Sequence, residues 1–260
     1  MSTIEGPPPD SQLFFSSIKA DDPSLLQLDF ILELNNIDAE SAKLESWQIV
    51  LNGRDGSRAF SLEANPVFLL NTSSESPDSF PLTLNMDVEA LVAEGLAPED
   101  HYEVSLSLHL SYGQNERLEV SGVAAFPGVL APEFHIINIA ILKAELVNTR
   151  FRVGIRIVNP NPFGVELSSF NYELYGNGRF WAEGAERNII EIPGKSAVEG
   201  YLFMLMNFIG MERSLLDQII NLVDVNYRFA GEALVSTGVM YLPGFNTAFD
   251  LSGYSQVLEN

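Results

Sequence analysis

The residues best suited to acid–base or metal chemistry gather at Glu99, Asp100, His101 and Glu103. Carboxylate oxygens and an imidazole this close together could hold a divalent cation. However, the cluster lacks the glycine-punctuated acidic spacing of a calcium loop, and acidic side chains are usually solvated. We therefore interpret the cluster as the exposed, acidic start of a strand, and we predict no metal site.

Covalent and cofactor chemistry have no recognisable motif in this chain. The sequence contains no cysteine, which excludes disulfides, thiolate catalysis and cysteine-ligated zinc. No serine lies in a G-x-S-x-G elbow. The glycine turn at 176–178 lacks the third glycine and the following helix of a dinucleotide-binding loop. We predict that the protein is not an enzyme, has no catalytic residues and uses no cofactor.

The most conspicuous motif is the run Asn159, Pro160, Asn161 and Pro162. Asparagine side chains can bind ligands, but they also bond to nearby backbone and favour turns. Each proline lacks a backbone N–H and restricts the residue before it to extended geometry. The motif therefore predicts a structural turn that ends one strand and directs the next.

Strands are predicted on both sides of this motif. Residues 151–158 alternate apolar side chains with polar or small ones, which is the period of a strand with one buried face. A second alternating run follows over 167–175, and the glycines after it allow a tight reversal of the chain. The motif and its flanking strands form the best-preserved part of a larger repeat.

The repeat has an offset of 123 residues, which carries position 9 to 132 and position 36 to 159. The constant offset pairs Pro9 with Pro132, Asn36 with Asn159, Leu44 with Leu167, and Gly53 with Gly176. Matching spacing of this kind indicates a tandem duplication. We predict three parts: a flexible N-terminal tether over 1–8, a diverged first domain over 9–129, and a second domain over 132–251.

Each copy is predicted to be mainly β, as an antiparallel sandwich of about seven short strands with one helix, of the immunoglobulin or fibronectin III type. In the second copy, apolar residues at three- and four-residue spacing predict a helix over 207–222. A shorter helix is expected over 88–92 in the first copy. A hairpin should end each copy, and in the second copy it is predicted between 225–230 and 233–242.

The helix at 207–222 begins with an unusually apolar stretch. Its simplest role is to cover the open end of the sandwich. The alternative is that it lines a cavity between helix and sheets, a place where ligand pockets often form, and methionines suit an adaptable apolar wall. The candidate wall consists of Met204, Met206, Phe208, Met211 and Leu215.

Composition indicates a folded but strongly acidic chain. Hydrophobic residues make up 46% of the sequence, and the net charge is −21. Residues 1–130 carry 21 acids and 5 bases, whereas residues 131–260 carry 14 acids and 9 bases. This charge counts against nucleic acid as a partner, because nucleic acid requires a basic face. It also counts against electrostatic docking to anionic lipid.

No transmembrane segment is predicted. The most apolar run, 201–211, is about half of the roughly 20 residues that a membrane span requires. Residues 1–10 show neither the basic nor the apolar region of a signal peptide, although they resemble a short tether. The localisation is therefore open between the cytoplasm and a periplasmic or cell-surface lipoprotein whose leader has been removed.

Residues 132–251 resemble the LEA type 2 family, which is also described by its water-stress and hypersensitive-response (WHy) domain. The resemblance rests on an apolar strand that runs into the motif at 159–162 and on the following strand, which ends at Gly176. Residues 9–129 look like a second, diverged copy, in which 35–38 replace the motif and the prolines are lost.

The resemblance implies a sandwich of two antiparallel sheets with one helix, no catalytic residues, and an association with desiccation or other stress. We therefore predict a non-enzymatic protein of stress tolerance, or a stable interaction module whose protein partners are unknown. The alternative function is binding or carriage of a lipid or other apolar ligand, because some relatives are proposed to hold such molecules.

Overall fold

The structure is a computed structural model of the 260-residue chain. It describes residues 10–36, 42–53, 59–64, 78–93, 101–112, 116–144, 148–207 and 224–259. The chain divides into two compact units. Unit 1 comprises Met1–Lys19 and Ser24–Val129, and unit 2 comprises Ala20–Pro23 and Leu130–Asn260. The expected N-terminal tether over 1–8 lies outside the described residues.

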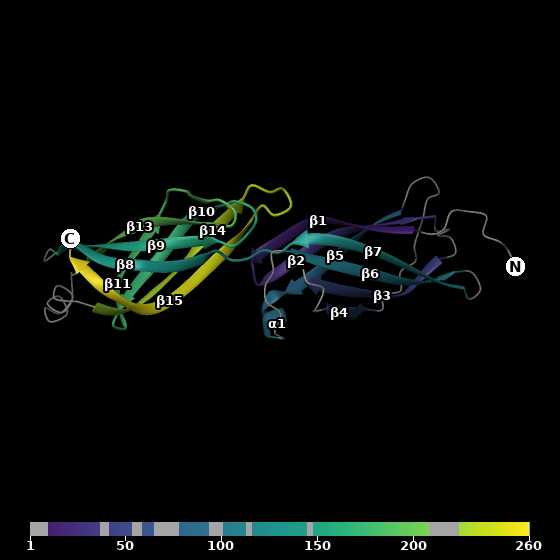
Figure 1. Ribbon diagram of the computed structural model, residues 1–260, viewed down its shortest axis with the longest axis horizontal. Coiled ribbons are helices and arrows are strands. Elements are labelled where there is room, and N and C mark those ends of the chain that lie inside the picture. The colour runs from purple at the N-terminus through teal and green to yellow at the C-terminus, as the bar shows by residue number, and fades with distance from the viewer. Residues whose placement is uncertain are drawn as a thin grey trace. The chain divides into compact units, whose positions relative to one another are not determined.

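The described part of unit 1 forms two antiparallel sheets and a short helix (Figure 1). The three-stranded sheet has the order β1 (Asp10–Asp22), β2 (Leu25–Asn35) and β5 (Asp78–Asp87). The four-stranded sheet has the order β4 (Ala59–Ala64), β3 (Ala42–Gly53), β6 (His101–Tyr112) and β7 (Glu116–Pro127). Helix α1 (Val88–Ala93) follows β5 directly.

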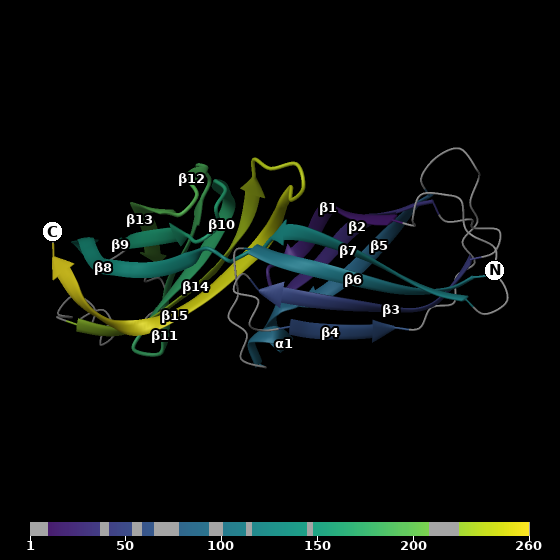
Figure 2. The ribbon, with the colours of Figure 1, turned by 45° about the vertical axis from the view of Figure 1, so that its right-hand side comes forward.

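The described residues of unit 2 form a single sheet of eight strands that closes on itself. The strands are β8 (Glu133–Ala144), β9 (Asn148–Asn159), β10 (Val165–Gly176), β11 (Arg179–Glu186), β12 (Ile190–Ile192), β13 (Ser196–Asn207), β14 (Asp224–Thr237) and β15 (Gly244–Glu259). Their order is β11-β13-β9-β8-β15-β14-β10-β12, and β11 also pairs with β10 (Figure 2). The pairing of β15 with β8 is parallel and the other strand pairs are antiparallel.

The prediction of a mainly β protein built from antiparallel sheets is confirmed. Helix α1 forms where a short helix was expected in the first copy. The helix predicted over 207–222 lies outside the described residues, apart from Asn207 at the end of β13. Among the helices of the described residues, none is long and apolar enough to cross a membrane.

The two units share one strand order. The β1-β2-β5 sheet of unit 1 corresponds to β8-β9-β13 in unit 2, and β4-β3-β6-β7 corresponds to β11-β10-β14-β15. Unit 2 joins its two halves through the parallel β8–β15 ladder. At the corresponding place in unit 1, Ser11 Oγ on β1 donates to the carbonyl oxygen of Ser121 on β7 at 2.7 Å. The common strand order agrees with the predicted duplication.

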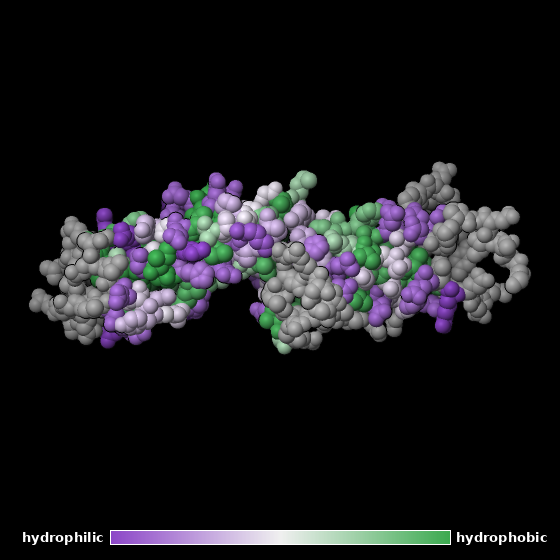
Figure 3. All heavy atoms as spheres, viewed as in Figure 1, coloured by the Kyte–Doolittle hydropathy of each residue, from purple (hydrophilic) through white to green (hydrophobic). Residues whose placement is uncertain are grey.

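Alternation along the strands builds the core of each unit. Phe151, Val153, Ile155 and Ile157 on β9 are at most 1% exposed, because successive side chains of a strand point to opposite faces. On the viewed surface of unit 2, hydrophilic residues lie among scattered hydrophobic ones (Figure 3). Aromatic side chains fill much of the interior, and Phe134 stacks on Phe249 with ring centroids 4.3 Å apart.

The hairpin predicted between 225–230 and 233–242 is wrong. Strand β14 continues through the supposed turn to Thr237 and pairs along its length with β15. Ala233 and Val235 keep the buried alternation of the strand, so the chain has no reason to reverse there. Strand β15 was not predicted, and it runs past residue 251, where the predicted second domain ends, to Glu259.

Candidate functional site

The asparagine motif lies at the end of β9, where the chain turns towards β10. Asn159 and Asn161 both lie in the core with no exposed surface. An unpaired buried amide costs about 1–3 kcal/mol, so buried side chains of this type are almost always hydrogen-bonded. The partners of these two residues therefore decide what the motif does.

Asn159 connects the β9–β10 turn to the segment after β12. Its Nδ2 donates to the carbonyl oxygen of Phe163 at 2.7 Å, and to those of Ile192 and Pro193 at 3.2 Å. Its Oδ1 accepts from the backbone N–H and from Nδ2 of Asn161, both at 3.0 Å. One buried side chain thus satisfies groups from two turns.

Asn161 connects the same turn to the segment that precedes β8. Its Oδ1 accepts from the N–H of Leu130 at 2.9 Å, and its Nδ2 donates to the Leu130 carbonyl oxygen at 2.8 Å. Its backbone carbonyl accepts from the N–H of Lys195 at 2.8 Å. Together with Asn159, it holds three separate segments of unit 2 in one hydrogen-bonded network.

This network leaves the asparagine side chains fully occupied. Each side-chain oxygen and nitrogen of Asn159 and Asn161 has a partner within the protein. Pro160 is half-buried and Pro162 is exposed, and neither has an N–H with which to extend the β9 ladder. The arrangement supports a structural role for the motif and offers no group to a ligand.

Most of the predicted apolar wall lies outside the described residues. Met204 is 1% exposed and belongs to the buried face of β13. Met206 is on the same strand, but its side chain is not among those described. The remaining three positions, Phe208, Met211 and Leu215, lie outside the described residues altogether.

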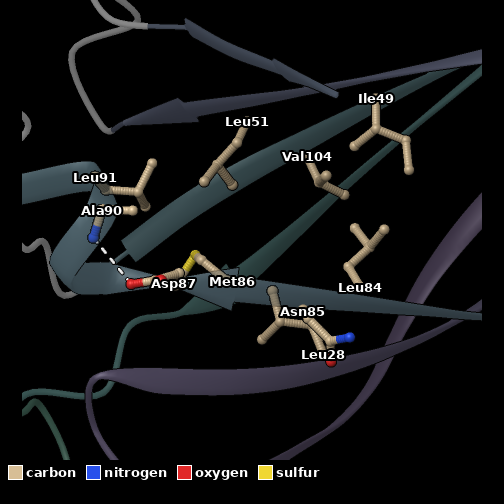
Figure 4. A pocket seen from close by; sticks show the side chains of 10 residues that line it. All are labelled: Leu28, Ile49, Leu51, Leu84, Asn85, Met86, Asp87, Ala90, Leu91 and Val104. Atoms are coloured by element: carbon tan, nitrogen blue, oxygen red, sulfur yellow. Dashed lines mark hydrogen bonds between the residues drawn. The ribbon is translucent and has the colours of Figure 1, made fainter. Parts of the chain in front are cut away.

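An apolar cavity of about 210 Å³ is present in unit 1, between the two sheets and next to α1 (Figure 4). Five of its lining side chains are buried, and two leucines add further apolar surface. The lining comes from four strands and the helix: Leu28, Ile49, Leu51, Leu84, Asn85, Met86, Asp87, Ala90, Leu91 and Val104. It is larger than the roughly 150 Å³ apolar cavity that binds benzene in another protein.

The helix beside the cavity is held in place by its first turn. Asp87 Oδ1 accepts from the N–H of Ala90 at 2.9 Å, which is the geometry of an N-terminal cap. The N–H of Val88 donates to the Ser24 carbonyl oxygen at 2.8 Å. Leu91 is the buried residue of the helix. The sequence did not predict this cavity, because a cavity depends on the distance between the two sheets, which no pattern along one strand encodes.

The acidic cluster shows no metal-binding geometry in the part of the chain that the structure describes. His101 and Glu103 are exposed at the start of β6, whereas Glu99 and Asp100 lie outside the described residues. No group of three histidine, aspartate or glutamate side chains among the described residues could hold a metal ion.

Asp29 on β2 is the centre of a separate polar cluster. Its carboxylate is 3.0 Å from Lys19 Nζ, and it accepts hydrogen bonds from the side chains of Thr83, Gln27 and Ser17. Partial burial acts to raise the pKa of Asp29, but these four interactions together outweigh it and lower the pKa to about 2. Such a fully engaged carboxylate is suited to stabilising the sheet and not to proton transfer.

Comparisons with known proteins do not assign a family. No family model matches the chain, and no curated protein matches it. A protein from Archaeoglobus fulgidus is 14% identical over 49% of this chain and 95% of its own, with a TM-score of 0.32. A structural-genomics target is 12% identical over 47% of this chain and 84% of its own, with a TM-score of 0.33.

A third similar structure is that of a 1.5-MDa bacterial ice-binding adhesin. It is 12% identical, the alignment covers 98% of this chain and 66% of that chain, and the TM-score is 0.32. Similarities this weak carry no conclusion about the function of this chain.

Proposed function

We propose that this protein is a non-enzymatic, LEA type 2-like protein that acts in stress tolerance or as a stable interaction module. The observation that carries the proposal is the buried pair Asn159 and Asn161, which gives the family-like motif a structural task in unit 2. Two cores with one strand order support the tandem arrangement. The mechanism needs no catalytic group, because it rests on two stable folds with a hydrated, acidic surface.

A drying assay tests this proposal. A dehydration-sensitive test enzyme is dried and rewetted with the protein, and its remaining activity is compared with that obtained with an equal mass of serum albumin. We expect the protein to preserve more activity than albumin does. Equal or lower preservation would contradict a role in stress tolerance. The proposal would then be limited to a stable interaction module.

The second candidate function is binding of a small apolar ligand, and the cavity beside α1 favours it. The cavity predicted beneath 207–222 of the second copy is a different one, and it falls on residues that lie outside the described ones apart from Asn207. The volume of the cavity beside α1, about 210 Å³, suits a small aromatic molecule or one end of an acyl chain. Its wall is almost entirely apolar, so shape and burial would decide which ligand binds.

Fluorescence titration with neutral 1-aminoanthracene tests this second function. Binding should disappear when a larger side chain fills the cavity, in either Leu84→Phe or Val104→Phe. Val123→Phe is the matched control, because Val123 is 56% exposed on β7 and outside the cavity lining. Absence of binding by the natural protein, or equal binding by all three variants, would exclude this site.

A further inference from the structure

One outer face of unit 2 combines arginines with exposed apolar side chains. The face belongs to the adjacent strands β9 and β13 (Figure 2). In their register, Phe203 lies opposite Arg152, and Leu205 lies opposite Arg150. We call this the arginine–aromatic face, and define it as Arg150, Arg152, Arg156, Tyr201, Phe203 and Leu205.

The apolar members of this face are open to solvent. Tyr201 is 54% exposed, Phe203 is 60% exposed, and Leu205 is 59% exposed, whereas Leu202 and Met204 between them are buried. Alternation along the strand therefore places three large apolar side chains in a row on the outside. They span about 13 Å, at roughly 3.3 Å per residue.

The arginines beside this row have no carboxylate partner among the described residues. Arg150 and Arg156 are exposed, and the guanidinium of Arg152 lies 4.8 Å from the centroid of the Tyr201 ring. None of the three forms an ion pair with a described residue. This is unexpected in a chain that has 35 acidic and only 14 basic residues other than histidine.

Unit 1 shows that the fold does not require these residues. The offset of 123 residues and the β2–β5 register identify the matching positions. Gln27, Asp29 and Glu33 stand in place of Arg150, Arg152 and Arg156, and Pro81, Thr83 and Asn85 stand in place of Tyr201, Phe203 and Leu205. The same strand arrangement therefore tolerates a mostly polar surface at these positions, with no arginine and no large apolar side chain.

We propose that the arginine–aromatic face docks unit 2 on an anionic phospholipid surface. Guanidinium groups pair with phosphate oxygens through parallel hydrogen bonds. Tyrosine favours the headgroup level of a bilayer, where its ring is apolar and its hydroxyl is hydrated. Phe203 and Leu205 supply the side chains that enter the acyl boundary, as on other peripheral membrane proteins.

The overall charge of −21 repels an anionic surface only weakly at this face. Exposed charges are screened beyond about 8 Å at physiological ionic strength, so the groups nearest the lipid dominate. Two acids lie beside the face by strand register, Glu199 opposite Arg156 and Glu183 opposite Leu205, and the three arginines outnumber them. The half of the chain that carries this face, 131–260, also has the smaller acidic excess.

Vesicle co-sedimentation of the full chain tests the proposal. The probes are vesicles of phosphatidylcholine alone and of equal parts phosphatidylcholine and phosphatidylglycerol. The face variant introduces residues that unit 1 already carries at the matching positions: Arg150→Gln, Arg156→Glu, Phe203→Thr and Leu205→Asn. The control variant makes the same kinds of change at other exposed sites of unit 2: Arg179→Gln, Arg187→Glu, Ile189→Thr and Met240→Asn.

The natural protein should bind the anionic vesicles more strongly than the neutral ones, and added salt should weaken the binding. One basic side chain near an anionic surface raises the membrane partition coefficient about fivefold. We therefore expect the face variant to bind the anionic vesicles more than tenfold more weakly than the natural protein does. The control variant should retain most of the binding. Circular dichroism must show the same β spectrum for both variants.

Three results would overturn the proposal. The first is that the natural protein fails to bind the anionic vesicles at low salt. The second is that both variants lose binding equally, which would indicate a general charge effect. The third is that light scattering shows a dimer that the face variant abolishes, with no lipid binding, which would make the face an interface between copies of this chain.

Discussion

The side chain of Asn161 and the backbone of Leu130 form a reciprocal pair of hydrogen bonds. The asparagine oxygen accepts from the Leu130 N–H at 2.9 Å, and its nitrogen donates to the Leu130 carbonyl at 2.8 Å. The Asn161 side chain thereby bonds to both backbone groups of Leu130, as a neighbouring strand would.

We expect Asn161→Ala to destabilise unit 2 by about 3 kcal/mol. The change leaves the Leu130 amide and carbonyl without these partners, and an unsatisfied buried group costs about 1–3 kcal/mol. Urea unfolding monitored by circular dichroism measures the loss. Asn246→Ala, at an exposed asparagine of β15, is the control and should change stability by less than about 0.5 kcal/mol. Equal effects of the two changes would contradict the structural role of Asn161.

Asp29 should make the stability of unit 1 depend on pH. Its folded-state pKa of about 2 is below the ordinary value of 3.8, so its stabilisation is present above pH 4 and is lost as the pH falls towards 2. Asp29→Asn should therefore lower the free energy of unfolding at pH 7 by at most about 2 kcal/mol. The two proteins should be nearly equal at pH 2.

Urea unfolding at several pH values measures this difference. Asp10→Asn is the control, because Asp10 is exposed at the start of β1. Its difference from the natural protein should stay within about 0.5 kcal/mol at each pH. A pH-independent difference for Asp29→Asn would mean that the hydrogen bonds around Asp29 do not favour its charged form.

Gly176 should tolerate no larger residue. A Cβ added there would overlap the indole ring of Trp181, which is 3% exposed and stacks on Phe151 at 5.4 Å between ring centroids. The ring cannot move away without disturbing the core, so we expect Gly176→Ala to cost about 1–3 kcal/mol.

Thermal or urea unfolding of Gly176→Ala measures this cost. Gly238→Ala is the matched control, because a Cβ at Gly238 would have no neighbour within 4 Å. The control should unfold nearly as the natural protein does. Equal stability of the two variants would contradict the close contact between Gly176 and the Trp181 ring.

Tyr172 should ionise far above the ordinary range of tyrosine. Burial is the main cause, with the negative charge of Glu186 as the second, and together they raise its pKa from 10.0 to about 12. Because the neutral phenol is favoured in the folded state, the stabilisation is present below pH 10 and is lost as the pH rises through 12. Phenolate absorbance of Tyr172→Phe, subtracted from that of the natural protein, should show a transition near pH 12. A transition near pH 10 would mean that Tyr172 is solvated.

The period of two in the sequence was enough to predict the strands around the asparagine motif. In β9, Phe151 and Ile155 are buried as the alternation requires, because that alternation is a local property of extended chain. The same local reasoning failed at Gly231, which was taken for part of a turn. Gly231 lies within β14, and the carbonyl oxygen of Asn171 comes so close to it that a Cβ would not fit. The glycine is therefore needed for this close approach between strands. A neighbour 60 residues away in sequence leaves no local signal.

The candidate sites divide in the same way. The sequence identified Asn159 and Asn161 as turn formers, but their partners at Leu130 and Ile192 come from segments that only the folded sheet brings near. The cavity predicted in the second copy falls on residues outside the described ones, whereas the cavity between the sheets and the helix of the first copy was not predicted. Side-chain type predicts what a residue can bond to, and tertiary packing selects the partner.

By itself, the sequence determined the mainly β architecture, the repeat at a constant offset and the turn at the asparagine motif, because each depends on spacing along the chain. Only the tertiary structure decided the parallel β8–β15 pairing that closes unit 2. Only the tertiary structure brought three arginines together with Tyr201 and Phe203 on one face of an otherwise acidic protein. Net charge is a sum over all residues, whereas a surface is made by strand register. That register depends on contacts between distant segments, which no local pattern contains.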